Sequence, residues 1–473
     1  MDWIRISQIL CMFGFLKEFR PGEPFITDYL TSEWKNFTSK QVTEDIYPIG
    51  TYSYCATLVL IFLLTDFLRY KPIIILCGVS GIVAFSALTF GNSLEVMQFL
   101  EVMYGLYLST DVAYYTYIYA KVDRKHYQKV SSYTRSAFLF GRFFASTVSQ
   151  LIISFRLMNY HQLNFLTIGG QVLATIWALF LPPVKQSVYF HRPAPIKGFI
   201  INSRDSNCEK AITGSGVEAS CDSKGHQVYD TRPLILKIKT AYYLLWKDFL
   251  KAYTSFHVLK WSLWWAAASC GYLQVLSYSQ PVWQTAVEKD DMIYNGAVEA
   301  LYSIIGAAVV FAIGRLRLNW DFLGEAMLAV FTFIEAILLF VTAHNYNIWV
   351  LYTLYITFGV IYHTIVTVAS FEVAKKISED SYGLVFGINI LVSLILQTIL
   401  TYIVTSGRVF KLHIRQQFVV YAWYFIVLAV LFAPVAVVTI VKSYRRGANV
   451  TVWAPRDDSS ESSSNQKIEE HCS

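Results

Sequence analysis

The chain has 473 residues, of which 55% are hydrophobic and only 15% charged, so it is more apolar and less charged than ordinary soluble domains. Its net charge of +6 lies in short clusters between apolar runs, as membrane topology requires, so we expect no nucleic-acid binding. The seven cysteines form no CxxC pair and no Cys/His spacing of a zinc site. This pattern indicates neither a disulfide framework nor a structural metal, and we expect no cofactor.

Apolar runs of about 20 residues, the length that crosses a membrane as a helix, recur through most of the chain. The first run lacks a signal-peptide cleavage site, so we interpret it as a retained span. The predicted spans are 7–29, 47–68, 72–91, 95–120, 131–154, 162–181, 258–281, 293–314, 322–343, 347–373, 382–405 and 415–441. They predict an all-α membrane protein of about twelve transmembrane helices in two six-helix halves.

Composition divides the chain into four parts. We expect an N-terminal six-helix bundle over 1–181, a cytosolic linker over 182–257, a C-terminal six-helix bundle over 258–441 and a disordered cytosolic tail over 442–473. The Ser, Gly and charged residues of the linker cannot bury enough apolar surface to fold alone, so it is predicted to be partly disordered. Its segment 234–256 alternates apolar and Lys residues, which is typical of an amphipathic helix on a membrane surface.

Lysine and arginine in short loops predict the orientation, because translocation disfavours these residues. They place both termini in the cytosol, with Arg408, Lys411 and Arg415 as exceptions in the last outer loop. The sequon at Asn36 then falls in the first outer loop, where it can be glycosylated. Two six-helix halves joined by a long cytosolic linker are typical of the major facilitator fold, whose substrate site lies near the midplane between the halves.

Charged residues inside spans are informative, because each costs about 2.5–3.5 kcal/mol or more at the bilayer centre. The first span contains Lys17, Glu18, Arg20 and Glu23 within a stretch whose Pro and Gly residues, at 20–24, should break the helix. We interpret this stretch as a broken helix that lines a cavity. The alternative is that the span simply ends at Arg20.

Asp111 lies deep inside the fourth span, with Tyr114 on the same helical face. A carboxylate beside an aromatic face holds an organic cation by charge pairing and cation–π attraction. The alternatives are a structural ion pair with Arg135 or Arg142 of the fifth span, and proton coupling through Asp111.

The second half offers aromatic and amide groups. Most of its tryptophans, Trp283 included, suit anchors at the membrane interface. Asn295 and Glu299 share one helical face and should meet polar surroundings. Between spans two and three, Asp66 and Arg69 resemble the gating motif of major facilitators, although a plain anchor at the membrane edge is an alternative reading.

Eight stretches resemble the reduced folate carrier and thiamine transporter family, from the first span to the twelfth. They are residues 20–26 (RPGEPFI) with 29–30 (YL), 51–54 (TYSY), 64–72 (LTDFLRYKP), 113–114 (AY) with 117–118 (YI), 126–130 (HYQKV), 261–265 (WSLWW), 294–297 (YNGA) and 384–389 (LVFGIN). The resemblance implies the major facilitator fold and transport of a water-soluble vitamin. Folates are aromatic dianions, whereas thiamine carries a fixed positive charge, so charged positions separate the two branches.

The resemblance favours the thiamine branch at three positions. Asp111 stands where folate carriers have an arginine and thiamine carriers a glutamate, and Gln397 stands where folate carriers have a lysine. A further arginine of the folate carriers falls at Gly359. The loss of three cations would leave a folate dianion facing uncompensated carboxylates. One departure from thiamine carriers is Gly50, where some of them have a tryptophan.

These observations predict a plasma-membrane thiamine uptake carrier that works by alternating access, with no catalytic activity. Asp111 and Glu23 would bind the cation, the rings of Tyr114, Tyr115 and Trp283 would stack, and Asn295 and Gln397 would contact the substrate. Arg20 and Arg135 would join Asp66 and Arg69 in gating or structural ion pairs. The partners expected are the vitamin, the lipid bilayer, and protons or an exchanged anion.

Three rival functions are weighed against this prediction. A folate carrier would use cations such as Arg20, Arg135 or Arg142. Seven spans would suit a non-transporting membrane receptor, whereas this sequence predicts about twelve. A membrane-embedded enzyme would need paired catalytic motifs such as HExxH, which the sequence lacks.

Overall fold

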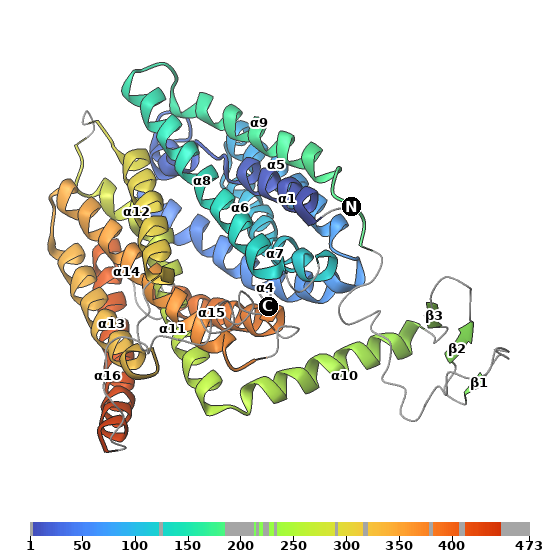
Figure 1. Cartoon of the computed structure of the whole chain (residues 1–473). Helices are drawn as coiled ribbons and strands as arrows, with labels where there is room; N and C mark the ends of the chain where they lie inside the picture. Colours follow the sequence, from blue (N-terminus) through green and yellow to red (C-terminus); the bar gives the residue numbers. More distant parts are fainter. Residues whose placement is uncertain are drawn as a thin grey trace, which may run out of the picture.

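The computed structural model describes residues 3–122, 126–184, 212–213, 217–220, 227–230, 234–288, 292–315, 320–377, 382–405 and 412–445. Within these ranges the chain is helical apart from one small sheet (Figure 1). The helices that precede the sheet are α1 (Trp3–Glu18), η1 (Glu23–Phe25), α2 (Ile26–Thr31), α3 (Ser39–Gln41), η2 (Val42–Ile46), α4 (Tyr47–Phe67), α5 (Lys71–Phe90), α6 (Leu94–Ser109), α7 (Asp111–Lys121), α8 (Tyr127–Ser154) and α9 (Tyr160–Ala178).

The second group of helices follows a long connecting helix, α10 (Leu234–Tyr253). Its members are α11 (Phe256–Gln284), α12 (Asn295–Arg315), α13 (Trp320–His344), α14 (Ile348–Ala374), α15 (Tyr382–Thr405) and α16 (Ile414–Arg445). In Figure 1 the two groups lie side by side, with α10 passing beneath them.

The sheet lies between α9 and α10. Its strands are β1 (Ile212–Thr213), β2 (Val217–Ser220) and β3 (Gln227–Asp230), which pair antiparallel in chain order. The composition of this segment predicted no strands. The residues of the predicted cytosolic tail beyond 445 lie outside the described part of the chain.

Eight helices within the described residues are long and apolar enough to cross a membrane. They lie within 39–65, 71–90, 130–154, 295–313, 323–344, 348–374, 383–405 and 414–442. The other four predicted spans coincide with α1, α6 together with α7, α9, and α11. Of these, α1 and α6 have only 16 residues each, and α7 has 11. The interruptions of these helices surround the cavity described below.

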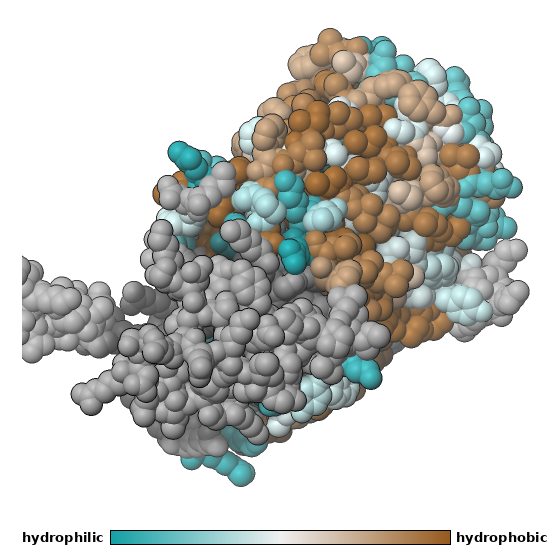
Figure 2. All heavy atoms as spheres, turned by 90° about the vertical axis from the view of Figure 1, so that its right-hand side faces the viewer, coloured by the Kyte–Doolittle hydropathy of each residue, from teal (hydrophilic) through white to brown (hydrophobic). Residues whose placement is uncertain are grey.

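The apolar residues divide between the interior and the surface. Phe13, Tyr107 and Tyr117 lie in the core of the N-terminal group, and Trp264 and Phe425 lie in cores of the C-terminal group, all fully or almost fully buried. Large apolar side chains also cover the outside, and Figure 2 shows them gathered over a broad area of one face. Such a surface suits lipid, because a soluble monomer rarely exposes so large an apolar area.

Two glycines let neighbouring helices approach the end of α1 closely. A Cβ atom on Gly141 of α8 would lie 2.6 Å from the carbonyl oxygen of Phe15. A Cβ atom on Gly170 of α9 would lie 2.6 Å from the carbonyl oxygen of Phe19. Because real Cβ atoms do not tolerate such distances, glycine at these positions holds the broken end of α1 between α8 and α9.

Candidate functional site

A cavity of about 310 Å³ lies between the two groups of helices. Its walls come from α1 and the turn after it, η1, α2, α4, α5, α6, α7 and α8 on one side, and from α11, α12 and α15 on the other. Five carboxylates line it, namely Glu18, Glu23, Glu101, Asp111 and Glu299, whereas Arg20 and Arg142 are the cations that line it. Its electrostatic character therefore depends on which carboxylates are already paired.

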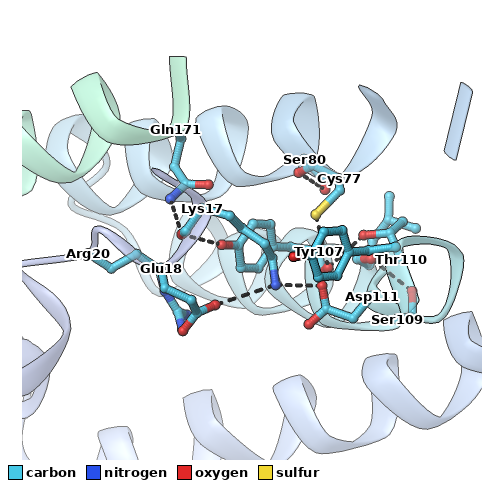
Figure 3. A network of polar contacts seen from close by, with 12 residues as sticks. Lys17, Glu18, Arg20, Cys77, Ser80, Tyr107, Ser109, Thr110, Asp111 and Gln171 are labelled. Carbon is cyan, nitrogen blue, oxygen red and sulfur yellow. Dashed lines mark hydrogen bonds and ion pairs between the residues drawn. The ribbon is translucent and has the colours of Figure 1, made fainter. Parts of the chain in front are cut away.

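Asp111, the first residue of α7, pairs with Lys17 near the end of α1. The Lys17 Nζ atom lies 2.5 Å from Asp111 Oδ1 and 3.5 Å from Glu18 Oε1, and Figure 3 shows the ammonium group between these two carboxylates. The Lys17 side chain is 1% exposed and that of Asp111 is 20% exposed. The ammonium is therefore shielded from the cavity, whereas Asp111 reaches it.

Arg20 lies between two carboxylates in the turn that follows α1. Its Nη2 atom is 2.7 Å from Glu18 Oε2, and its Nη1 atom is 2.9 Å from Glu23 Oε1. The hydroxyl of Tyr104 accepts from Arg20 Nη1 at 3.1 Å and donates to Glu23 Oε1 at 2.8 Å. These bonds fix the broken segment, and the Glu23 side chain stays 27% exposed.

Glu299 of α12 connects the two groups of helices. Its Oε2 atom lies 3.3 Å from Arg142 Nη2 of α8, and its Oε1 atom accepts from the Tyr355 hydroxyl at 2.6 Å. Arg142 therefore pairs with Glu299, and the ion pair of Asp111 is made by Lys17 instead of by Arg135 or Arg142. The Arg135 side chain is exposed.

Glu101 of α6 differs from the other carboxylates of the cavity. It is 7% exposed and lines the cavity, and within the described residues no hydrogen bond or ion pair reaches its carboxylate. It faces Gly50 of α4, where a Cβ atom would collide with Glu101 Oε2. The missing side chain at Gly50 thus gives the Glu101 carboxylate its space.

The structure brings three of the predicted substrate residues to the cavity, Glu23, Asp111 and Gln397. Tyr114 and Tyr115 lie behind the wall, where the Tyr114 hydroxyl donates to the carbonyl oxygen of Leu10 at 3.0 Å. In this conformation the Tyr114 side chain therefore does not face the cavity.

Trp283 and Asn295 also lie outside the cavity lining. The Trp283 ring packs edge-on against Tyr352 and Tyr355, 5.1 Å and 5.0 Å between ring centroids. Asn295 donates to Asp28 Oδ2 at 3.0 Å, and Gln284 donates to Asp28 Oδ1 at 2.9 Å. Asp28 belongs to α2, so these amides join the two groups of helices beside the cavity.

The remaining predicted residues lie at or just after the end of α4 and in the loop between α2 and α3. Arg69 follows α4 with φ at 61°, and the side chain of Asp66 lies outside the described part of the structure. Asn36 is exposed, and its Nδ2 atom donates to the carbonyl oxygen of Glu33 at 3.1 Å.

Sequence reasoning missed Glu101 and the pairing role of Lys17. Both residues lie inside predicted spans, so their charge alone was a usable signal. The charge of Lys17 was noted in the first span, but its pairing with Asp111 and the space that Gly50 leaves for Glu101 depend on neighbouring helices that the sequence does not place.

Comparison with known proteins identifies the family of this chain. A family model described as Reduced folate carrier matches residues 1–420. The chain is 39% identical to Thiamine transporter 2 of Homo sapiens over 446 residues, 91% of this chain and 89% of that protein. It is 37% identical to Thiamine transporter 1 of Homo sapiens over 461 residues, 94% and 92% of the two chains.

A less similar relative and a solved transporter structure also match this chain over most of its length. The Reduced folate transporter of Homo sapiens is 33% identical over 454 residues, 94% of this chain and 74% of that protein. The crystal structure of the POT family transporter PepTSo superposes with a TM-score of 0.63 at 12% identity, covering 93% of this chain and 99% of that chain. This likeness concerns the fold alone and confirms the predicted major facilitator fold.

Proposed function

Because this chain belongs to the reduced folate carrier family, we propose that it is a plasma-membrane uptake carrier for thiamine that works by alternating access. The chain is a multi-pass membrane transporter and not an enzyme. The two thiamine transporters of Homo sapiens are more similar to it, at 39% and 37% identity, than the reduced folate transporter at 33%. Both termini lie in the cytosol in this proposal, as the loop charges predict.

The excess of carboxylates in the cavity is the observation that carries the thiamine assignment. Five carboxylates line the cavity, and three cations, Lys17, Arg20 and Arg142, pair with four of them. If all are ionised, two negative charges are uncompensated, and Glu101 has no partner among the described residues. A cationic substrate supplies the missing charge.

The aromatic lining supports the same substrate class. Tyr47, Tyr54, Phe85, Tyr104 and Phe138 all border the cavity. Rings of this kind attract a cation by their negative faces and stack on flat heterocycles. Thiamine combines a positive thiazolium ring with an aminopyrimidine ring, so it matches both features, and the cavity of about 310 Å³ is within the range of small-ligand sites.

A folate would meet the opposite situation. The cations that line the cavity, Arg20 and Arg142, already pair with Glu18, Glu23 and Glu299. A dianion would have to break these pairs and then face Glu101 and Asp111, at a cost of several kcal/mol. We therefore keep the folate carrier only as the alternative that the experiment tests.

Uptake of radiolabelled thiamine and radiolabelled folate in cells that lack their own carriers, with and without this chain, tests the proposal. We expect saturable thiamine uptake above background and no folate uptake. Asp111→Ala should reduce thiamine uptake while the amount of carrier at the cell surface stays constant. Folate uptake in the absence of thiamine uptake would refute the proposal. Repeating the uptake across an imposed pH gradient shows whether protons move with the vitamin.

A further inference from the structure

The surroundings of the Lys17 ammonium group are those of a bound organic cation. Besides Asp111 Oδ1 at 2.5 Å and Glu18 Oε1 at 3.5 Å, two rings face the ammonium. Its Nζ atom lies 4.8 Å from the centroid of Tyr107 and 5.4 Å from that of Phe138. Carboxylates combined with aromatic faces are the groups that hold alkylammonium ligands.

The four groups around the Lys17 ammonium, Glu18, Asp111, Tyr107 and Phe138, form a cage that borders the substrate cavity. Asp111, Glu18 and Phe138 are shared between the cage and the cavity lining. The shielded side of the cage is formed by Tyr107, and Figure 3 shows the Lys17 side chain passing beside that ring toward Asp111. A cation that entered from the cavity would therefore reach the same Asp111 carboxylate from the opposite side.

The backbone of Lys17 is fixed, whereas its side chain ends in rotatable bonds. The carbonyl oxygen of Lys17 accepts from the Tyr107 hydroxyl at 3.0 Å and from Gln171 Nε2 at 2.9 Å. The ammonium can therefore leave Asp111 by side-chain rotation without movement of α1, and Glu18 offers a second carboxylate 3.5 Å away.

We propose that Lys17 is a tethered competitor of the cationic substrate. Its ammonium neutralises Asp111 in the empty carrier and gives this carboxylate up when the substrate cation arrives. The inference rests on the proposed function and names Lys17 as a positioning residue that sets affinity through Asp111. The arrangement avoids a buried uncompensated carboxylate in the empty state, and it weakens substrate binding by the strength of the ion pair that must break.

Lys17→Met tests the proposal, because methionine keeps most of the length and removes the charge. With the competitor gone, the KM for thiamine should fall about tenfold, which corresponds to about 1.4 kcal/mol. The maximal rate per carrier should not rise, because tighter binding of the ground state does not speed its release. Lys40→Met is the matched control, since Lys40 is 61% exposed and lies outside the cavity lining. A KM for Lys17→Met equal to or above that of the parent would overturn the proposal.

The charge-balanced double variant separates competition from structural damage. Lys17→Met combined with Asp111→Asn removes both members of the ion pair, so neither buried charge is left alone. The tenfold fall in the KM for thiamine should then disappear, because the carboxylate that binds the substrate cation is gone. A gain that persists in the double variant would contradict the role of Asp111. If Lys17→Met does not reach the membrane, Lys17→Gln gives the same reading with a neutral hydrogen-bonding side chain.

Binding of tetramethylammonium to the purified carrier distinguishes this inference from the proposed function. Thermal unfolding is followed with tetramethylammonium chloride and with sodium chloride at equal ionic strength. We expect tetramethylammonium to stabilise Lys17→Met and to have little effect on the parent. This result without any thiamine uptake would support the Lys17 cage and refute the thiamine carrier. Normal thiamine uptake with no response of Lys17→Met to tetramethylammonium would refute the cage alone.

Discussion

Glu101 and Asp111 are both carboxylates of the same predicted span, but only Asp111 has an ion-pair partner among the described residues. Asp111 has Lys17 as its ion-pair partner, whereas no partner reaches Glu101 within the described part of the chain. A buried carboxylate without a partner costs several kcal/mol. Natural sequences keep such groups where a ligand completes them, so we expect Glu101 to contact the substrate.

The substitution Glu101→Gln tests this contact. It should raise the KM for thiamine at least tenfold, or about 1.4 kcal/mol, because the substrate loses an ionic partner. The unfolding temperature should stay level or rise, because the variant no longer buries an uncompensated charge. Glu95→Gln is the matched control, because Glu95 lies on the same helix but is exposed. An unchanged KM for Glu101→Gln would exclude the contact.

The predicted charged substrate residues lie at the cavity, whereas the predicted aromatic residues do not line it. Glu23 and Asp111 line the cavity because charged groups inside spans avoid lipid, which depends only on composition. Tyr114 and Trp283 do not line the cavity: the Tyr114 hydroxyl donates to the carbonyl oxygen of Leu10, and the Trp283 ring packs edge-on against Tyr352. Their direction depends on packing that a single sequence does not contain.

Two helices are interrupted where they border the cavity, and the sequence predicts only one of the breaks. Proline and glycine at 20–24 end α1, which stops at Glu18. The break between α6 and α7 contains neither residue. There the hydroxyl of Thr110 donates to the carbonyl oxygen of Tyr107 at 2.6 Å, and such bonds compete with helical ones and bend helices. The sequence therefore suggested one continuous span over 95–120.

Lys35 stabilises the end of another helix. Its Nζ atom donates to the carbonyl oxygens of Thr89 and Gly91 at the end of α5 and to Asn92 Oδ1, and the side chain is buried. Lys35→Met should lower the free energy of unfolding by about 1–3 kcal/mol, because these acceptors lose a charged donor. Thermal unfolding in detergent measures the change. Lys40→Met, at an exposed position, serves as the comparison, and an equal effect of both variants would contradict the role of Lys35.

Asp28 connects the elements α2, α11 and α12 on the side of the cavity that we expect to face outward. Asp28→Ala leaves the Asn295 amide without its acceptor, at about 1–3 kcal/mol for this buried donor, and leaves the Gln284 amide only Thr31 Oγ1, at 2.9 Å. The outward-open state should gain population. A membrane-impermeant maleimide should then label a cysteine placed at Ser277, in the cavity wall, faster than in the parent. Asp45→Ala, at an exposed position, is the control, and equal labelling rates would show that Asp28 does not hold this side closed.

The whole molecule follows from helix periodicity and apolar length more directly than its site does. Eight helices within the described residues meet the requirements of a membrane span, and the four interrupted or more polar ones coincide with the other four spans that the apolar runs predicted. The sheet β1–β3 was not predicted, because its strands are short and lie in a polar segment. The pairing across the halves, such as Arg142 with Glu299, also depends on the assembled fold.

The orientation of the molecule has a direct test at Asn36. This residue is exposed and belongs to the first loop that we expect outside the cell. Carrier expressed in mammalian cells should therefore lose apparent mass after treatment with an N-glycosidase, and Asn36→Gln should migrate like the treated protein. A carrier whose mass is the same before and after treatment would argue against an outward position of this loop.

Calorimetry of thiamine binding to the purified carrier, with folate as competitor, shows whether uncompensated carboxylates select the substrate. We expect that the parent binds thiamine and that a hundredfold excess of folate does not displace it. Glu101→Gln combined with Asp111→Asn should weaken thiamine binding about a hundredfold, or about 2.8 kcal/mol. Displacement by folate, or unchanged binding in the double variant, would contradict a site that recognises its substrate through uncompensated carboxylates.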